Sequence, residues 1–226
     1  MTPPRAVLAW SGGKDSAWAL HLVRQSGEAE VAGLLTALAE ADGRVTLHGV
    51  PEELAAAQAA ALGLPLRTMR IPSPCSDAEY AARVAAALES ARADGVTHVI
   101  YGDLYLESVR PERERQAAAA GLTPLFPLWH RGTALTAEAM ILGGLRARVV
   151  SVDLAKLPRE FCGREYDEDF VCDLPAGVDP CGENGEFHTF CHAGPMFGSP
   201  VAFAAGAVVE RDGFAWAELS APPRCP

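Results

Sequence analysis

Apolar positions in the first 128 residues fall into short runs separated by alanine-rich segments of ten or more residues. The short runs predict buried strands, and the longer segments, with proline or serine at their starts and glycine at their ends, predict helices. Strands that alternate with helices indicate βαβ units, and therefore an α/β fold with a Rossmann-like parallel sheet and helices on both faces. The predicted strands are residues 6–10, 31–38, 66–71 and 97–101, and the predicted helices are residues 16–25, 51–62, 76–94 and 111–120.

The pattern is less regular after Leu128. A helix is predicted over residues 136–145 and a strand over 147–152, followed by a polar, glycine-rich stretch from 159 to 192. Two further apolar runs, 201–210 and 214–219, are joined through Asp212-Gly213, which predicts a hairpin. We therefore expect two domains, residues 1–128 and a smaller α+β domain of residues 129–226.

Composition limits the class of protein. Apolar residues make up 49% of the chain and charged residues 21%, as in globular proteins. No apolar run approaches the roughly 18 residues of a membrane span, and the N-terminus lacks the layout of a secretory signal, so we expect a cytoplasmic protein. The net charge of −10 argues against a nucleic-acid partner. A homo-oligomer is compatible with the sequence.

The six cysteines include no C-x-x-C pair, so we expect reduced thiols. Four of them are spaced by ten, nine and ten residues, whereas ligands of structural zinc are usually paired two to four residues apart. Free thiols are therefore favoured over a zinc site at Cys162, Cys172, Cys181 and Cys191.

The strongest chemical signal is Ser11-Gly-Gly-Lys-Asp-Ser16, between the first predicted strand and the first predicted helix. Glycines let the backbone approach an anion, and the helix N-terminus directs free N–H groups at it. The spacing fits neither a Walker A loop nor the G-x-G-x-x-G fingerprint. A tight turn capped by Ser11 or Asp15 is the structural alternative. The predicted phosphate-binding residues are Ser11, Gly12, Gly13, Lys14, Asp15 and Ser16.

This hexapeptide, following a first strand, resembles the loop of the PP-loop ATP pyrophosphatases, which have a HUP-type Rossmann-like fold. Members of that superfamily cleave ATP between the α and β phosphates and leave a substrate adenylated. The resemblance implies that the loop grips the β and γ phosphates and that Asp15 is a Mg²⁺ ligand.

Three further stretches resemble one branch, the diphthine–ammonia ligase family, and the short, alanine- and arginine-rich chain is similar to its prokaryotic members. The resemblance implies an ATP-dependent ligase that joins ammonia to a carboxylate through an acyl-adenylate, releasing AMP and pyrophosphate. The stretches are 47–66 (Leu47-His-Gly-Val-Pro, then Gln58 and Ala61-Leu-Gly-Leu-Pro-Leu66), 101–129 (Tyr101-Gly-Asp-Leu-Tyr-Leu-Glu107 to Trp129) and 179–189 (Asp179-Pro-Cys-Gly-Glu-Asn-Gly-Glu-Phe-His-Thr189).

The second stretch supplies charged candidates. Gly102 and Asp103 follow a predicted strand, and open α/β sheets bind ligands at the carboxyl ends of their strands. Asp103 and Glu107 are candidates to hold magnesium or orient a nucleophile. Guanidinium groups suit phosphate or carboxylate, which makes Arg110 and Arg113 candidates for ATP binding. The alternative to ATP binding is that these arginines form ion pairs with Glu112 and Glu114 on a solvated helix face. For Arg115 this alternative is favoured.

The other two stretches contribute candidates of mixed chemistry. His48, beside a glycine and a proline, is a candidate contact of adenine or a loop cap. Carboxylates, an amide and a histidine in the third stretch are suited to positioning ammonia, a cationic substrate or a metal, and an Asn-Gly turn with an edge strand is the alternative. Together with Asp103 from the second stretch, we select Glu183, Glu186 and His188 as catalytic candidates, and Glu107, Asn184 and Phe187 as substrate-binding candidates.

Residues 160–190 carry nine acids and one base, so most of the net charge lies beside the third stretch. An acidic substrate side would suit a cationic substrate or ammonium, and a solvated acidic loop is the alternative. Two other functions use the same phosphate loop. A tRNA-modifying enzyme is expected to show a basic face and often a C-x-x-C pair, and a non-catalytic ATP-binding sensor needs the loop alone.

Overall fold

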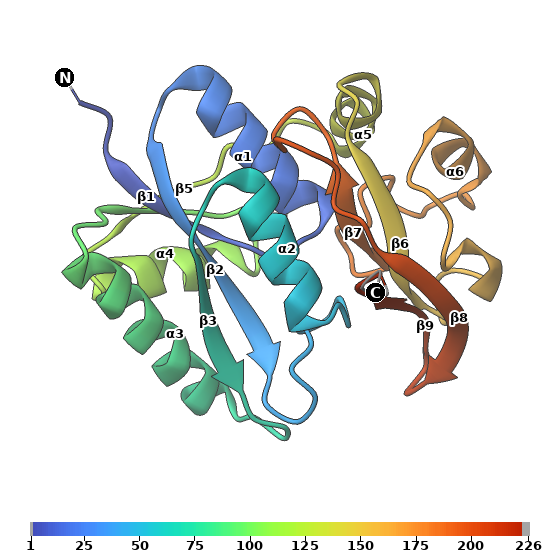
Figure 1. Cartoon of the computed structure of the whole chain (residues 1–226), viewed down its shortest axis with the longest axis horizontal. Helices are drawn as coiled ribbons and strands as arrows, with labels where there is room; N and C mark the ends of the chain where they lie inside the picture. The colour runs from blue at the N-terminus through green and yellow to red at the C-terminus, as the bar shows by residue number, and fades with distance from the viewer. Residues whose placement is uncertain (1, 223–226) are drawn as a thin grey trace.

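A parallel sheet forms the first part of the chain in the computed structural model, which describes residues 2–222 (Figure 1). Its strand order is β3-β2-β1-β4-β5, and every neighbouring pair is parallel. The predicted fold class is confirmed. The strands are β1 (Arg5–Ala9), β2 (Glu30–Ala39), β3 (Leu66–Ile71), β4 (His98–Ile100) and β5 (Thr123–Leu125), and the helices are α1 (Lys14–Ser26), α2 (Glu52–Leu62), α3 (Asp77–Ala93) and α4 (Arg110–Ala119).

Helices cover both faces of this sheet because successive side chains of a strand point to opposite sides. Ala6 and Leu8 of β1 share a core with residues of α1 and α2. Val7, between them, packs in a separate core with residues of α3 and α4.

The short strand β5 is absent from the sequence prediction. It contains Pro124, which cannot donate a hydrogen bond to a ladder and is a signal against a strand. The strand lies at the edge of the sheet, next to β4, where a missing donor is tolerated.

A smaller antiparallel sheet with strand order β7-β6-β9-β8 forms the C-terminal region. The predicted hairpin is present as β8 and β9, joined by Asp212 and Gly213, which both have positive φ. The helix predicted over 136–145 begins earlier and ends at Leu142, before Gly143-Gly144. The elements are α5 (Thr133–Leu142), β6 (Arg146–Asp153), the 3-10 turn η1 (Arg159–Phe161), α6 (Glu168–Asp173), β7 (Phe187–Ala193), β8 (Ala204–Arg211) and β9 (Phe214–Ser220).

Strand β7 lies at the edge of this sheet, as the alternative for the third stretch, an Asn-Gly turn with an edge strand, predicted. Its sequence, Phe187-His-Thr-Phe-Cys-His-Ala193, does not alternate between apolar and polar residues, because most of its positions are buried whichever way they point. The part of the chain that forms the parallel sheet is here called the first region, and the part that forms the antiparallel sheet is called the second region. Polar side chains of β7 contact the first region, as the site shows.

The two sheets share one hydrophobic core. Ala17 and Leu20 of α1 belong to the same buried cluster as Val149 of β6 and Cys191 of β7. Helix α1 therefore lies between the parallel sheet and the antiparallel sheet (Figure 1).

Within residues 2–222, no helix is long and apolar enough to cross a membrane. The five cysteines in this part of the chain form no disulfide with one another, and Cys225 lies outside the described residues.

Candidate active site

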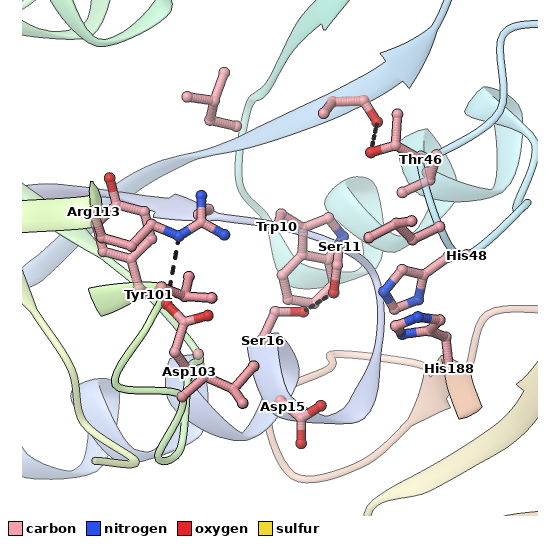
Figure 2. A pocket seen from close by; sticks show the side chains of 18 of the residues that line it. Trp10, Ser11, Asp15, Ser16, Thr46, His48, Tyr101, Asp103, Arg113 and His188 are labelled. Atoms are coloured by element: carbon pink, nitrogen blue, oxygen red, sulfur yellow. Dashed lines mark hydrogen bonds and ion pairs between the residues drawn. The ribbon is translucent and has the colours of Figure 1, made fainter. Parts of the chain in front are cut away.

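A cavity of about 380 Å³ opens at the carboxyl ends of β1, β2 and β4, and residues preceding and within β7 close one side of it (Figure 2). It brings together residues from all the stretches singled out in the sequence. The predicted site residues that line it are Ser11, Lys14, Asp15, Ser16, His48, Gly102, Asp103, Arg113, Glu183, Phe187 and His188.

The phosphate loop requires both of its glycines. Gly12 has φ +77°, and a Cβ there would lie 2.6 Å from Oε1 of Gln58. A Cβ on Gly13 would lie 2.7 Å from Cε1 of His48. The hydroxyl of Ser16 donates to the Gly13 carbonyl at 3.0 Å. The loop is therefore a close-packed turn that opens onto the first turn of α1.

Gln58 packs behind the phosphate loop. It lies in the stretch 47–66 but is not among the predicted site residues. It is fully buried. Its Oε1 accepts from the Trp10 indole at 3.0 Å, and its Nε2 donates to the carbonyls of Gly12 (2.9 Å) and Cys191 (2.6 Å). A lone polar residue on the alanine-rich face of α2 is the signal that marks this role.

Strand β7 completes the loop from the second region. Gly13, the N-cap of α1, makes no side-chain cap hydrogen bond. Instead the Lys14 N–H donates to Oγ1 of Thr189 at 3.0 Å. The Cys191 N–H also donates to the Gly12 carbonyl at 2.8 Å. Thr189 therefore caps α1 from a distant part of the chain, a role that local sequence patterns do not reveal.

Two histidines face each other on the cavity wall, with ring centroids 4.7 Å apart (Figure 2). His48 comes from the loop before α2 and His188 from β7. His48 Nδ1 donates to the Thr189 carbonyl at 2.9 Å, which leaves its Nε2 as an acceptor. Burial lowers the pKa of His48 to about 4 and holds the pKa of His188 well below its usual value. Both rings are therefore neutral near pH 7.

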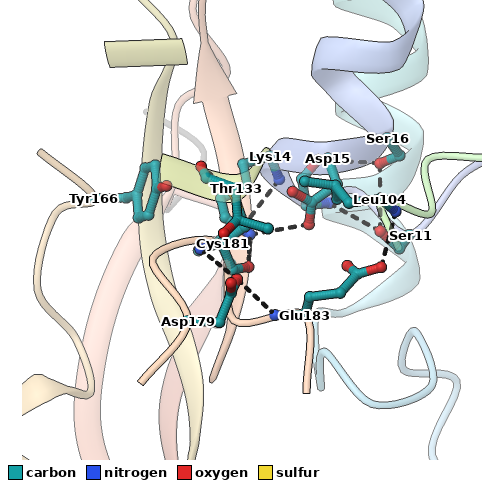
Figure 3. Close-up of polar contacts among 12 residues, drawn as sticks. Ser11, Lys14, Asp15, Ser16, Leu104, Thr133, Tyr166, Asp179, Cys181 and Glu183 are labelled. Carbon is teal, nitrogen blue, oxygen red and sulfur yellow. Dashed lines mark hydrogen bonds and ion pairs between the residues drawn. The ribbon is translucent and has the colours of Figure 1, made fainter. Parts of the chain in front are cut away.

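The ammonium group of Lys14 ties the loop to the second region (Figure 3). It donates to Asp15 Oδ2 at 2.9 Å and to the Cys181 carbonyl. It lies 5.4 and 5.2 Å from the ring centroids of Tyr166 and Phe187, so Lys14 contacts the ring of Phe187, a predicted substrate-binding residue. Burial disfavours its charge, but the acidic groups around it, Asp15 first with Cys181 and Glu183, together outweigh this and raise the pKa of Lys14.

Asp15 keeps one oxygen for a further partner. Its Oδ1 is buried and accepts no hydrogen bond from the described residues, and burial raises the pKa of the carboxyl although Lys14 opposes the rise. Residues 2–222 contain no group of three His, Cys, Asp or Glu side chains that could hold a metal by themselves. Mg²⁺ is usually bound by one or two carboxylates together with substrate phosphates, so Asp15 fits the expected ion when a nucleotide is present.

Glu183 joins the two regions across the cavity (Figure 3). Its Oε1 accepts from the backbone N–H groups of Leu104 at 2.8 Å and Tyr105 at 3.2 Å, just after β4. Burial raises the pKa of Glu183 to about 7, and the two N–H donors oppose the rise.

The opposite wall carries an ion pair. Arg113 Nε lies 3.6 Å from Asp103 Oδ2, and its guanidinium lies 5.1 Å from the centroid of the Tyr101 ring. Gly102 lies against the first turn of α1, since a Cβ there would lie 3.0 Å from the Ser16 nitrogen. The predicted site residues Gly102, Asp103 and Arg113 thus all line the cavity.

Outside the phosphate loop, four predicted site residues, Glu107, Arg110, Asn184 and Glu186, do not line the cavity. Glu107 is exposed. Arg110 pairs with Glu114 at 2.7 Å and stacks on Phe126 and Trp129, each 4.6 Å from the ring centroid. Arg115 pairs with Glu112, as the alternative had it. Glu186 is buried beneath the loop, where its Oε1 accepts from the Asp179 N–H and from the Asn184 amide, while the Asn184 Oδ1 accepts from the Tyr105 hydroxyl.

The acids of residues 160–190 do not face the cavity as a group. The hypothesis of an acidic substrate side is therefore wrong. Among these nine acids, Glu183 lines the cavity. Several of the other acids form ion pairs or helix caps within the second region. Glu165 binds Arg148 and His192, Asp167 caps α6, and Asp173 pairs with Arg164.

Comparisons with known proteins agree with this arrangement. Residues 4–124 match the model of the diphthamide synthase N-terminal domain, and residues 134–209 match that of the diphthamide synthase C-terminal domain. The diphthine–ammonia ligase of Danio rerio is 30% identical over 223 residues, covering 85% of this chain and 84% of that protein. With the phosphate loop and the third stretch meeting at one cavity, these matches show that the chain belongs to the diphthamide synthase (diphthine–ammonia ligase) family.

Proposed function

We propose that this protein is an ATP-dependent ligase that forms an amide from ammonia and a carboxylate, releasing AMP and pyrophosphate. The observation that carries the proposal is the meeting of the phosphate loop with Glu183 and His188, from the second region, at one cavity. A nucleotide-binding module alone needs the loop, whereas a ligase needs a second set of polar groups facing the nucleotide.

In the first step an oxygen of the substrate carboxylate attacks the α-phosphorus of ATP. The bond to the bridging oxygen breaks, and pyrophosphate leaves with that electron pair. Ser11, Ser16 and the N-terminal turn of α1, which face the cavity, would hold the departing phosphates. Asp15 would hold Mg²⁺, which neutralises phosphate charge as it develops.

In the second step ammonia attacks the carbonyl carbon of the acyl-adenylate, AMP leaves, and the nitrogen loses a proton. His48 Nε2 and His188 offer neutral acceptors for N–H groups on the wall beside the loop. Arg113 and Asp103 orient groups at the opposite wall. The contribution of the protein is positioning and charge stabilisation.

Pyrophosphate exchange tests the proposal. The protein is incubated with ATP, Mg²⁺, labelled pyrophosphate and a panel of carboxylates, and label entering ATP is measured. We expect exchange that depends on one class of carboxylate, and AMP as the product once ammonium is added. Formation of ADP and phosphate would contradict the proposal, and ATP binding without exchange on any carboxylate would favour the sensor.

A further inference from the structure

The loop between β2 and α2, residues 40–51, here called the His48 loop, rests on the C-terminal hairpin. It carries Thr46, Leu47 and His48 to the cavity wall. Its partner is β9 in the interior of the second sheet, and β9 lies beyond both ranges that match the family models.

The first contact is between a glycine and an aromatic ring. A Cβ on Gly49 would lie 2.8 Å from Cε3 and 2.9 Å from Cζ3 of Trp216, so the backbone of the loop lies directly on the indole. Gly49 has φ +66°, which also favours glycine. The Trp216 Nε1 is buried and has no hydrogen-bond partner among residues 2–222, so the ring acts here through its flat face.

The second contact is a pair of hydrogen bonds made by the guanidinium group of Arg44. Arg44 Nη1 donates to the Gly49 carbonyl at 2.7 Å, and Arg44 Nη2 donates to Glu218 Oε2 at 2.9 Å. Glu218 and Trp216 are two residues apart on β9 and so point to the same side of the strand. The hairpin thus holds Arg44, and Arg44 joins the two sides of the loop across its tip, from residue 44 to residue 49.

The tip of the loop needs such support. Leu47 has φ +65°, a conformation that L-residues other than glycine rarely adopt, and its side chain is 70% exposed. A backbone in this region persists only where its surroundings hold it. Below the tip, Val45 and Val50 pack with Leu219 of β9 in one buried cluster. The chain on both sides of Leu47 is therefore packed, while the Leu47 side chain is exposed.

We propose that Trp216 and Glu218 are positioning residues for the nucleotide site, because they hold His48 against His188 and beside Gly13. The proposal rests on the proposed function only in taking ATP as the ligand of the cavity. A loop released from β9 loses the conformation in which His48 lies beside the phosphate loop, and the affinity for ATP falls.

Calorimetric titration with ATP and Mg²⁺ tests this in the full chain. We expect Kd to rise about tenfold for Trp216→Ala, which corresponds to about 1.4 kcal/mol. Glu218→Gln, a half-exposed change that keeps the fold, should raise Kd about threefold. Trp216→Phe keeps an aromatic face and should restore binding to within about twofold of wild type. The matched control is Glu210→Gln, which breaks the Arg159 ion pair on the same hairpin away from the loop.

Hydrogen exchange gives a readout that is independent of ATP. Exchange in residues 44–50 should rise in Trp216→Ala and Glu218→Gln and stay at the wild-type level in Glu210→Gln. Unchanged exchange there, or an unchanged Kd in folded Trp216→Ala and Glu218→Gln, overturns the proposal. If wild-type protein binds no ATP, the proposed function fails, and the exchange data still decide whether the hairpin holds the loop.

Discussion

At the scale of single residues, Thr189 has a structural role that cannot be predicted from its residue type or from the neighbouring sequence. Its hydroxyl caps α1 through the Lys14 N–H, and its carbonyl fixes the ring of His48. One residue of the second region therefore orients two parts of the proposed ATP site.

Replacing Thr189 with valine keeps the shape and removes the acceptor. We expect Thr189→Val to lose about 1 kcal/mol of unfolding free energy, the usual value of an N-cap. Thr189→Ser keeps the hydroxyl and should lose much less. Urea unfolding followed by circular dichroism measures both, and equal losses in the two variants would contradict a capping role.

Glu183 makes the stability depend on pH. Folding raises the pKa of Glu183 from 4.5 to about 7, so the folded chain binds this proton more tightly than the unfolded chain. The resulting stabilisation is complete below pH 4.5 and is lost as the pH rises through 7. The melting temperature of wild type relative to Glu183→Gln should therefore fall from about pH 5 to about pH 8. A flat difference across this range would show that Glu183 does not titrate there.

Asp15 is predicted to act on ATP rather than on the fold. Asp15→Asn keeps an oxygen for Lys14 and removes the charge offered to Mg²⁺. We expect pyrophosphate exchange to fall by about two orders of magnitude, as when a charge-stabilising group is removed from an active site. Exchange at the wild-type rate would mean that the loop chemistry is assigned wrongly.

At the scale of elements, the junction of α2, the phosphate loop and β7 depends on Gln58. Gln58→Met retains the volume but leaves the Trp10 N–H and the carbonyls of Gly12 and Cys191 without this partner. Because unsatisfied buried groups cost about 1–3 kcal/mol each, we expect a large loss of stability together with weaker ATP binding.

Gln116→Met is the matched control for that change. Gln116 is also a buried glutamine on a helix, and it bonds to Glu112 within α4. Its replacement should affect stability alone, as measured by denaturant unfolding and ATP titration. Weaker ATP binding in the Gln116 variant would remove the case for a specific role of Gln58.

Elements were easier to predict from the sequence than the contacts between them. Runs such as Ala6–Trp10 and caps such as Ser76 are local signals, and the structure has β1 and α3 there. Strand β7 does not alternate, because its polar Thr189 and His188 are directed at another region. The loop motif and the three further stretches led to the predicted residues that line the cavity, while Thr189 and Trp216 act through distant partners that no spacing along the chain encodes.

At the scale of the whole molecule, the two sheets share one core, with α1 between them. We therefore expect a single cooperative unfolding transition in differential scanning calorimetry, with equal calorimetric and van 't Hoff enthalpies. Two separate transitions would show that the regions unfold independently and that the shared core contributes little.

The burial of Lys14 also decides where the protein can be chemically tagged. The chain has two lysines, Lys14 and Lys156. The Lys14 amine is enclosed, whereas the Lys156 side chain is 42% exposed and donates to the Asn184 carbonyl. Apart from the N-terminal amine, an amine-reactive dye should therefore attach at Lys156 alone. The attached dye would lie beside the loop that carries Glu183, where its fluorescence could report the binding of substrate. The phosphate loop would remain unmodified.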